Sequence, residues 1–275
     1  MNANVIKNYS SLKPSLFVFP VVFLVIIVLL LYQQDSLSVE KYIQIQKNCF
    51  LVLNSELSQF PKVLFNLTQL GDAIVLLSFL SIFIVYAPKI WEYLISASLI
   101  SFIICTPLKK IFAVPRPAAA FDNNSFVIIG KTLSGHSSLP SGHSVTIFTA
   151  LTILFFAFMP QTLKYKILWF VFVIAVGLII VSTRVGVGAH YPLDVIIGSI
   201  IGYISALLGV FINEKYKLLT WVSNKKYYPI IILFFLICCA SLLSRVLHEN
   251  LMVFYLSLIT VVISLSKIIS AYVKK

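Results

Sequence analysis

Charged residues are scarce in this chain of 275 amino acids. They make up 11% of the sequence, and only nine of them are acidic, whereas ordinary soluble domains are roughly 25% charged. Hydrophobic residues account for 60%. A domain of this size cannot hide so much apolar surface from water, which excludes a soluble bundle of buried helices. The composition predicts a membrane protein with several spans.

Cysteine is also scarce, and its positions offer no framework. Cys105, Cys238 and Cys239 fall within apolar stretches, and Cys49 stands alone in a mixed segment. There is no C-x-x-C pattern, so neither a zinc site nor a disulfide scaffold is predicted. The sequence also lacks a cluster of metal ligands, an internal repeat and a low-complexity linker. We therefore expect one membrane domain without a metal or other cofactor.

Long apolar runs are abundant. A transmembrane helix needs about 20 predominantly apolar residues. The first run is expected to stay in the protein, because Leu16–Leu31 is long for a signal peptide and residues 32–34 do not resemble a small-residue cleavage site. The eight predicted spans are 15–32, 64–87, 91–108, 143–160, 166–183, 192–213, 227–244 and 251–270.

The net charge of +12 does not indicate a nucleic-acid partner, because the basic residues are scattered between the apolar runs. Lysine and arginine in short loops are enriched on the cytoplasmic side of a membrane. With eight spans and a cytoplasmic N-terminus, that side carries twelve of the 21 basic residues, and three of the other nine are candidates for chemistry. Both termini are therefore predicted in the cytoplasm, with the motif-bearing loops outside.

Two of the outer segments are too long to be simple turns. Residues 33–63 mix polar and apolar side chains, which favours a helix lying on the membrane surface. Residues 109–142 contain three prolines, two glycines and several cations. Long loops held by a rigid scaffold often carry function. The short third segment, 184–191, is expected near the second if the helices form a bundle.

The third segment ends in a histidine at a helix start. Pro192 suits the first turn of a helix, and Asp194 lies four residues after His190 on the same face. A carboxylate there can accept a hydrogen bond from one imidazole nitrogen and leave the other free to attack. The alternative is structural: Asp194 favours the helix N-terminus, and His190 caps it.

A second histidine opens another apolar helix. Ser141, Gly142 and His143 come at its start, where backbone N–H groups are free to bind an anion. His143 can protonate a leaving oxygen and later deprotonate water. The alternative is a Pro-Ser-Gly turn with an incidental histidine.

Three cations accompany these histidines. Guanidinium groups match the oxygens of a phosphoryl group, which suggests Arg116 and Arg184 as ligands, together with Lys109. The alternatives are an interfacial lysine for Lys109 and solvated loop charges for both arginines.

Three more polar residues are weaker candidates. Asp72 lies inside the span predicted at 64–87, and an intramembrane carboxylate suggests either contact with a headgroup or a structural hydrogen bond. His136 either touches substrate or is a solvated loop residue. His248 lies in a short loop, and we expect no role for it.

The motifs Lys109-x6-Arg116-Pro117, Pro140-Ser141-Gly142-His143 and Arg184-x5-His190-x3-Asp194 together resemble the signature of the type-2 phosphatidic-acid phosphatase family, within the superfamily that includes vanadium haloperoxidases. The resemblance implies an all-α membrane bundle, with a six-helix phosphatase core in residues 1–213. The resemblance spans residues 109–194 and says nothing about residues 227–275. The last two apolar runs predict a C-terminal transmembrane hairpin in residues 214–275. One position departs from the family pattern, since Thr183 stands where serine is usual.

The resemblance also implies roles for the motif residues. His190 would be the nucleophile that forms a phosphohistidine, Asp194 would orient it, and His143 would act as general acid and then base. No metal is implied. The residues implied to bind the phosphate are Lys109, Arg116, Ser141, Gly142 and Arg184.

The expected function is therefore metal-independent hydrolysis of a membrane lipid phosphate at the outer face of the cytoplasmic (bacterial inner) membrane. Phosphatidylglycerophosphate, phosphatidic acid, undecaprenyl diphosphate and lipid A phosphates all fit, and the sequence does not choose among them. A phosphotransferase that passes the phosphoryl group to another lipid is the main alternative. A non-catalytic scaffold is disfavoured because every signature residue is present. The sequence does not determine the oligomeric state.

Overall fold

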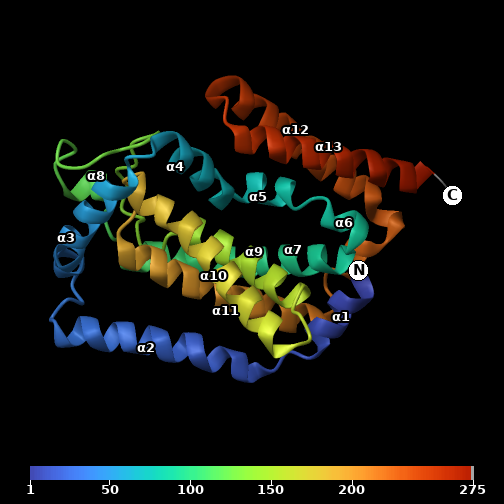
Figure 1. Cartoon of the computed structure of the whole chain (residues 1–275), viewed down its shortest axis with the longest axis horizontal. Helices are drawn as coiled ribbons and strands as arrows, with labels where there is room; N and C mark the ends of the chain where they lie inside the picture. Colours follow the sequence, from blue (N-terminus) through green and yellow to red (C-terminus); the bar gives the residue numbers. More distant parts are fainter. Residues whose placement is uncertain (274–275) are drawn as a thin grey trace.

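A computed structural model describes residues 1–273, and within that range every regular element is a helix (Figure 1). Six of these helices are long and apolar enough to cross a membrane, which confirms the predicted all-α membrane bundle. The helices are α1 (Asn2–Ser10), η1 (Pro14–Phe17), α2 (Val18–Gln33), α3 (Val39–Leu57), α4 (Pro61–Thr68), η2 (Gln69–Gly71), α5 (Ala73–Phe79), α6 (Phe83–Tyr86), α7 (Pro88–Phe112), α8 (Pro117–Ala120), α9 (Gly142–Ala157), α10 (Leu163–Gly186), α11 (Pro192–Tyr216), η3 (Thr220–Ser223), η4 (Lys225–Tyr227), α12 (Tyr228–Glu249) and α13 (Met252–Val273).

Two of the eight predicted spans differ from a long straight helix. The fourth is α9, which has only 16 residues. The second, 64–87, was predicted as one continuous helix, and that prediction is wrong. The chain bends by 85° between the segment Pro61–Gly71 and α5. Asp72 is extended there, and its carboxylate accepts hydrogen bonds from the backbone N–H groups of Ile74 and Val75, which starts a new helix.

Helices α7, α9 and α11 form the centre of the bundle, and glycines on α11 bring them close together. A Cβ atom added at Gly198 would lie 2.7 Å from the carbonyl oxygen of Ser141. One added at Gly209 would lie 2.5 Å from the Cα atom of Ala97 on α7. Small residues permit such close backbone contact between membrane helices. The contact at Gly198 sets the beginning of α11 directly against the beginning of α9.

Helix α3 packs across the end of the bundle where α9 and α11 begin. The buried Asn54 donates to the backbone carbonyls of Val185 and Gly186, at 3.1 and 3.0 Å. The buried Gln46 accepts from the backbone N–H of Leu193 at 2.8 Å. The helix predicted in residues 33–63 is therefore present, and its position at a membrane surface stays a prediction.

Helix α1 packs at the opposite end of the bundle (Figure 1). Tyr9 donates to the carbonyl oxygen of Ile153 at 2.7 Å, and Asn8 donates to that of Ala157 at 3.0 Å. Both acceptors belong to the last part of α9. The N-terminus and the start of α9 are therefore a helix length apart.

The C-terminal helices α12 and α13 pack as an antiparallel pair against α5 and α6, on the side of the core away from α2 (Figure 1). They share an apolar cluster with Trp91 of α7, which is fully buried. Arg245 of α12 forms an ion pair with Asp72 at 3.0 Å. The hairpin is thus attached at the helix break. The division of the chain at residue 213 stays a prediction.

Candidate active site

The loop between α10 and α11 delivers His190 to the interior. Gly188 has a φ of 76°, a left-handed conformation that favours glycine, and a Cβ atom there would lie 2.7 Å from the carbonyl oxygen of Val127. The backbone N–H groups of Ala189 and His190 both donate to the carbonyl of Arg184, at 3.0 and 3.2 Å. The turn leaves the His190 side chain 1% exposed.

Ser138 stands between His190 and Asp194. The Nδ1 atom of His190 lies 3.6 Å from Oδ2 of Asp194, too far for a direct hydrogen bond. The Ser138 hydroxyl donates to the same carboxylate oxygen at 2.6 Å and lies 3.3 Å from Nδ1. The direct hydrogen bond expected from the sequence is therefore replaced by a relay through a buried serine.

Asp194 is fully buried and accepts hydrogen bonds on both oxygens. Tyr42 of α3 donates to Oδ1 at 2.8 Å. The backbone N–H of Tyr191 donates to Oδ2 at 3.0 Å, as part of a capping box at the start of α11. Asp194 therefore helps to cap α11 and also faces the histidine. The N-cap residue is Tyr191, so the alternative in which His190 caps the helix is wrong.

The other imidazole nitrogen faces cations. Nη1 of Arg116 lies 3.3 Å from Nε2 of His190 and donates to the carbonyl oxygen of Ala189 at 3.3 Å. A guanidinium group only donates, so Nε2 is the acceptor, and the ring proton belongs on Nδ1, facing Ser138. Burial, followed by the positive charges of Arg116 and Arg184, holds the pKa of His190 well below its ordinary value. The ring is therefore neutral at neutral pH, with its unprotonated nitrogen toward the cations.

Arg184 and His143 line one cavity of about 210 Å³, together with Gly188 and Ala189, the two residues before His190. His190, Arg116 and Lys109 are not among its lining residues. The guanidinium of Arg184 is buried and donates to Thr68 at 2.7 Å, while its Nε atom has no partner within the described residues. His143 packs against Gly71, where a Cβ atom would lie 2.5 Å from that of His143. The helix break thus forms one wall of this cavity.

Fewer backbone N–H groups are free at the start of α9 than the sequence predicts. The backbone N–H of Ser141 donates to the carbonyl oxygen of Asp194 at 3.0 Å, and its hydroxyl accepts from Ser144 at 2.9 Å. The expectation that the Ser141 N–H is free is therefore wrong. The first-turn N–H groups of Gly142 and His143 remain as donors. Lys109 lies beside them, since a Cβ atom at Gly142 would be 3.8 Å from its Nζ atom.

The three weaker candidates lie in different settings. Asp72 caps α5 and pairs with Arg245, which is the structural one of its two alternatives. His136 is exposed in its loop and is not among the residues that line the cavity. His248 is exposed on α12, with its Nδ1 atom 2.7 Å from the carbonyl oxygen of Ser244.

Three residues that form hydrogen bonds with Asp194 or Arg184 are not predicted from the sequence. Ser138 precedes the Pro140–His143 motif, but a loop serine carries no sign that it will be buried. Tyr42 and Thr68 lie 152 and 116 residues from their partners. No local pattern marks them, because their role depends on how α3 and α4 pack.

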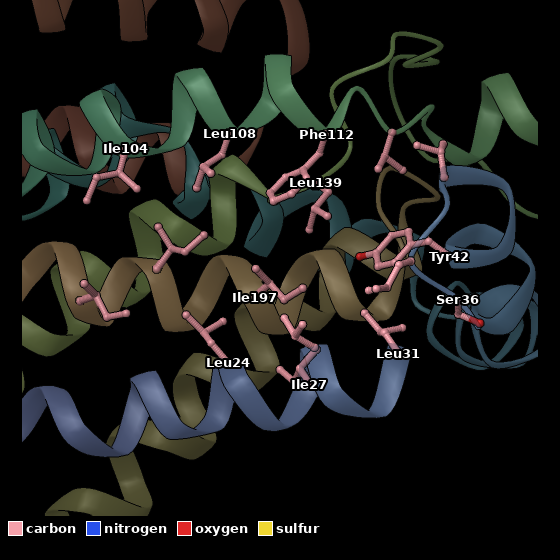
Figure 2. Close-up of a pocket in the computed structure, with 16 residues that line it drawn as sticks. Leu24, Ile27, Leu31, Ser36, Tyr42, Ile104, Leu108, Phe112, Leu139 and Ile197 are labelled. Atoms are coloured by element: carbon pink, nitrogen blue, oxygen red, sulfur yellow. The ribbon is translucent and has the colours of Figure 1, made fainter. Parts of the chain in front are cut away.

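An apolar groove of about 450 Å³ runs toward the site between α2, α7 and α11. In Figure 2, Leu24, Ile27 and Leu31 on α2 face Leu108 and Phe112 on α7. One end of the groove, at the right in Figure 2, is lined by Tyr42, whose hydroxyl group donates a hydrogen bond to Asp194. Apolar surface therefore extends from the side of the bundle to Tyr42, the hydrogen-bond partner of Asp194.

Part of this chain matches a known family model. Residues 90–218, slightly less than half of the chain, match the model of the PAP2 superfamily. The segment contains all three parts of the signature. Within the residues that the structure describes, no group of three or more His, Cys, Asp or Glu is placed to hold a metal ion.

Curated relatives extend the comparison. The chain is 32% identical over 156 residues to a lipid A 1-phosphatase of Rhizobium etli, a match that covers 52% of this chain and 62% of the relative. It is 34% identical over 140 residues to a lipid A 1-phosphatase of Rhizobium johnstonii, covering 49% and 52%. The chain thus spans less than two thirds of the length of either relative.

A solved structure has a similar fold. The crystal structure of Aquifex aeolicus LpxE matches with a TM-score of 0.50 and 25% sequence identity. The match covers 61% of this chain and 95% of that protein. Part of this chain therefore lies outside the shared fold.

Proposed function

We propose that this protein hydrolyses a phosphate ester of a membrane lipid through a phosphohistidine. The observation that carries the proposal is the environment of His190. Its unprotonated Nε2 atom lies 3.3 Å from Arg116, and Ala189, which precedes His190 in the chain, lines the same cavity as Arg184 and His143. A neutral nucleophile next to cations that can hold the phosphoryl oxygens is the arrangement that phosphoryl transfer requires.

In the first step, Nε2 of His190 attacks the phosphorus atom. The bond from phosphorus to the lipid oxygen breaks, and its electron pair stays on that oxygen, which takes a proton from His143. Arg116, Arg184 and Lys109 hold the non-bridging oxygens. The free Nε donor of Arg184 supports this assignment, since a buried donor without a partner is costly.

In the second step, water attacks the phosphohistidine. His143, now neutral, takes a proton from that water, and the phosphorus–nitrogen bond breaks. The electron pair returns to Nε2, and inorganic phosphate leaves. While the ring is phosphorylated it carries positive charge, which the buried carboxylate of Asp194 stabilises through Ser138.

A lipid substrate follows from the surroundings of the site. The apolar groove beside Tyr42 offers hydrocarbon surface for a tail, and the relatives named above are lipid A 1-phosphatases. Phosphatidic acid, phosphatidylglycerophosphate, undecaprenyl diphosphate and lipid A phosphates are the candidates. We place the reaction at the outer face of the cytoplasmic membrane, in accord with the loop charges.

The test is phosphate release by the purified protein from a panel of these lipids. His190→Ala should abolish release from every lipid, and Ser138→Ala should lower kcat about tenfold, the scale of one hydrogen bond to a charged group. Protein quenched in base should carry phosphate on histidine, because the phosphorus–nitrogen bond is stable in base and labile in acid. Substantial turnover by His190→Ala would refute the proposal, and labelled phosphate on an added acceptor lipid would identify a phosphotransferase.

A further inference from the structure

The C-terminal hairpin supplies part of the wall of the cavity beside His143. Glu249, the last residue of α12, lines this cavity together with His143 and Arg184. Lys131 also lines it. Among the lining residues that the structure describes, Glu249 is the only carboxylate. It lies beyond the segment 90–218 that matches the superfamily.

Two contacts hold the end of α12, which carries the exposed Glu249, in this position. One helical turn earlier, Arg245 pairs with Asp72 at the helix break. Four residues later, the backbone N–H of Val253 donates to Asn66 of α4 at 3.3 Å. Both partners belong to the segments around α4 and η2 that line the same cavity. The end of α12 is therefore fixed to the cavity wall on both sides of Glu249.

A carboxylate next to a phosphate site affects which substrates can bind there. It repels the phosphoryl group, so it cannot serve as a ligand for it. An ionised carboxylate only accepts hydrogen bonds, and it prefers hydroxyl or ammonium donors. The cavity thus has cations for a phosphate and an acceptor for a neighbouring polar group.

We propose that Glu249 selects lipid phosphates whose alcohol carries a hydroxyl or ammonium group next to the phosphate ester. The inference rests on the proposed function and concerns the choice of substrate at the same site. The volume of about 210 Å³ is below the roughly 300–1,000 Å³ of typical ligand pockets, so the group beside the phosphate is small. A second phosphate at this place is disfavoured by the charge of Glu249.

The experiment uses three single-chain lipid phosphates that differ only at the carbon next to the ester-bearing carbon. This carbon carries hydrogen, a hydroxyl group or an ammonium group. We expect kcat/KM of the full-length protein to be about tenfold higher for the two donor-bearing lipids than for the hydrogen compound. Glu249→Gln should abolish the preference for ammonium, and Glu249→Lys should reverse it. Glu56→Gln, at an exposed glutamate on α3, is the matched control.

The outcomes separate this inference from the proposed function. If the wild type releases phosphate from all three lipids and Glu249→Gln keeps the same ratios of kcat/KM, the role of Glu249 is refuted while the proposed function stands. If Glu56→Gln changes the ratios as much as Glu249→Gln does, the effect is a general one of surface charge and the role is also refuted. If the wild type releases no phosphate from any lipid, the proposed function itself fails.

Discussion

His190 depends on three polar neighbours for its proposed work. Ser138 and Asp194 lie on the Nδ1 side, and Arg116 lies on the Nε2 side. The Ser138 hydroxyl group links the imidazole ring to the carboxylate of Asp194 by hydrogen bonds, and the carboxylate itself does not contact the ring directly. Because Asp194 also caps α11, replacing it would remove a helix cap along with the charge. Ser138 is the cleaner position at which to measure the relay.

The protonation of His190 can be observed directly. Burial and the nearby cations lower its pKa, so the ring should stay neutral as the pH falls through about 6.5, the ordinary pKa of histidine. The protein has only four histidines, which makes ¹⁵N NMR of histidine-labelled protein practical. We expect the His190 signals, assigned with His190→Ala, to show the neutral Nδ1–H form at pH 6. The exposed His136 and His248 serve as references in the same spectra. A protonated His190 at pH 7 would contradict this assignment.

At the scale of elements, the break between η2 and α5 has two functions in the fold. It lets Asp72 cap α5 and pair with the C-terminal hairpin, and it brings Gly71 against His143. The break thus links the position of the proposed acid–base residue to α12.

Gly71→Ala tests that link. The added methyl group would lie 2.5 Å from the Cβ atom of His143, so the imidazole must move. A displacement of about 1 Å in a catalytic group can cost on the order of 100-fold in rate. We expect a large loss of kcat for an alkyl lipid phosphate and a much smaller loss for a phosphate ester of 4-nitrophenol, whose leaving oxygen needs no proton.

Gly135→Ala is the matched control, because the nearest atom to a Cβ there is 3.9 Å away. Its kcat should stay within about twofold of the wild type. Equal losses of kcat for both esters in Gly71→Ala would show that the substitution does not act through His143.

At the scale of the whole molecule, the proposed site lies at one end of the bundle and α1 at the other (Figure 1). The site is assembled from more than the superfamily segment. Tyr42 and Thr68 precede residues 90–218, and Glu249 follows them. Segments outside the shared domain therefore complete the environment of the signature residues.

The side of the membrane on which the site lies can be tested with one native cysteine. Cys49 is exposed on α3, at the site end of the bundle. We expect a membrane-impermeant maleimide to label it in intact cells. Lys7→Cys in a Cys49→Ser background is the control, since Lys7 is exposed on α1 at the other end, and it should react only after permeabilisation. The opposite pattern would place the site in the cytoplasm.

The sequence alone predicted those features of the protein that depend on local composition and on the spacing of motif residues. The length and polarity of the apolar runs predicted a helical membrane bundle, because a bilayer accepts helices whose backbone groups are satisfied internally. The motif spacings predicted that His143, Arg184 and His190 would gather, since each lies at or near the end of an apolar helix. The assignment of their chemistry remains a proposal.

The hydrogen bonds and ion pairs between residues far apart in the chain depend on the packing of the helices. Ser138 separates His190 from Asp194 because of contacts between residues 52 and 56 positions apart, and Tyr42 reaches Asp194 across 152 positions. The break at Asp72 follows from a cap and an ion pair with Arg245, which no apolar pattern reveals. Such contacts depend on how helices meet in space, so only the folded chain shows that Asp194 faces His190 and that Glu249 lines the cavity with His143.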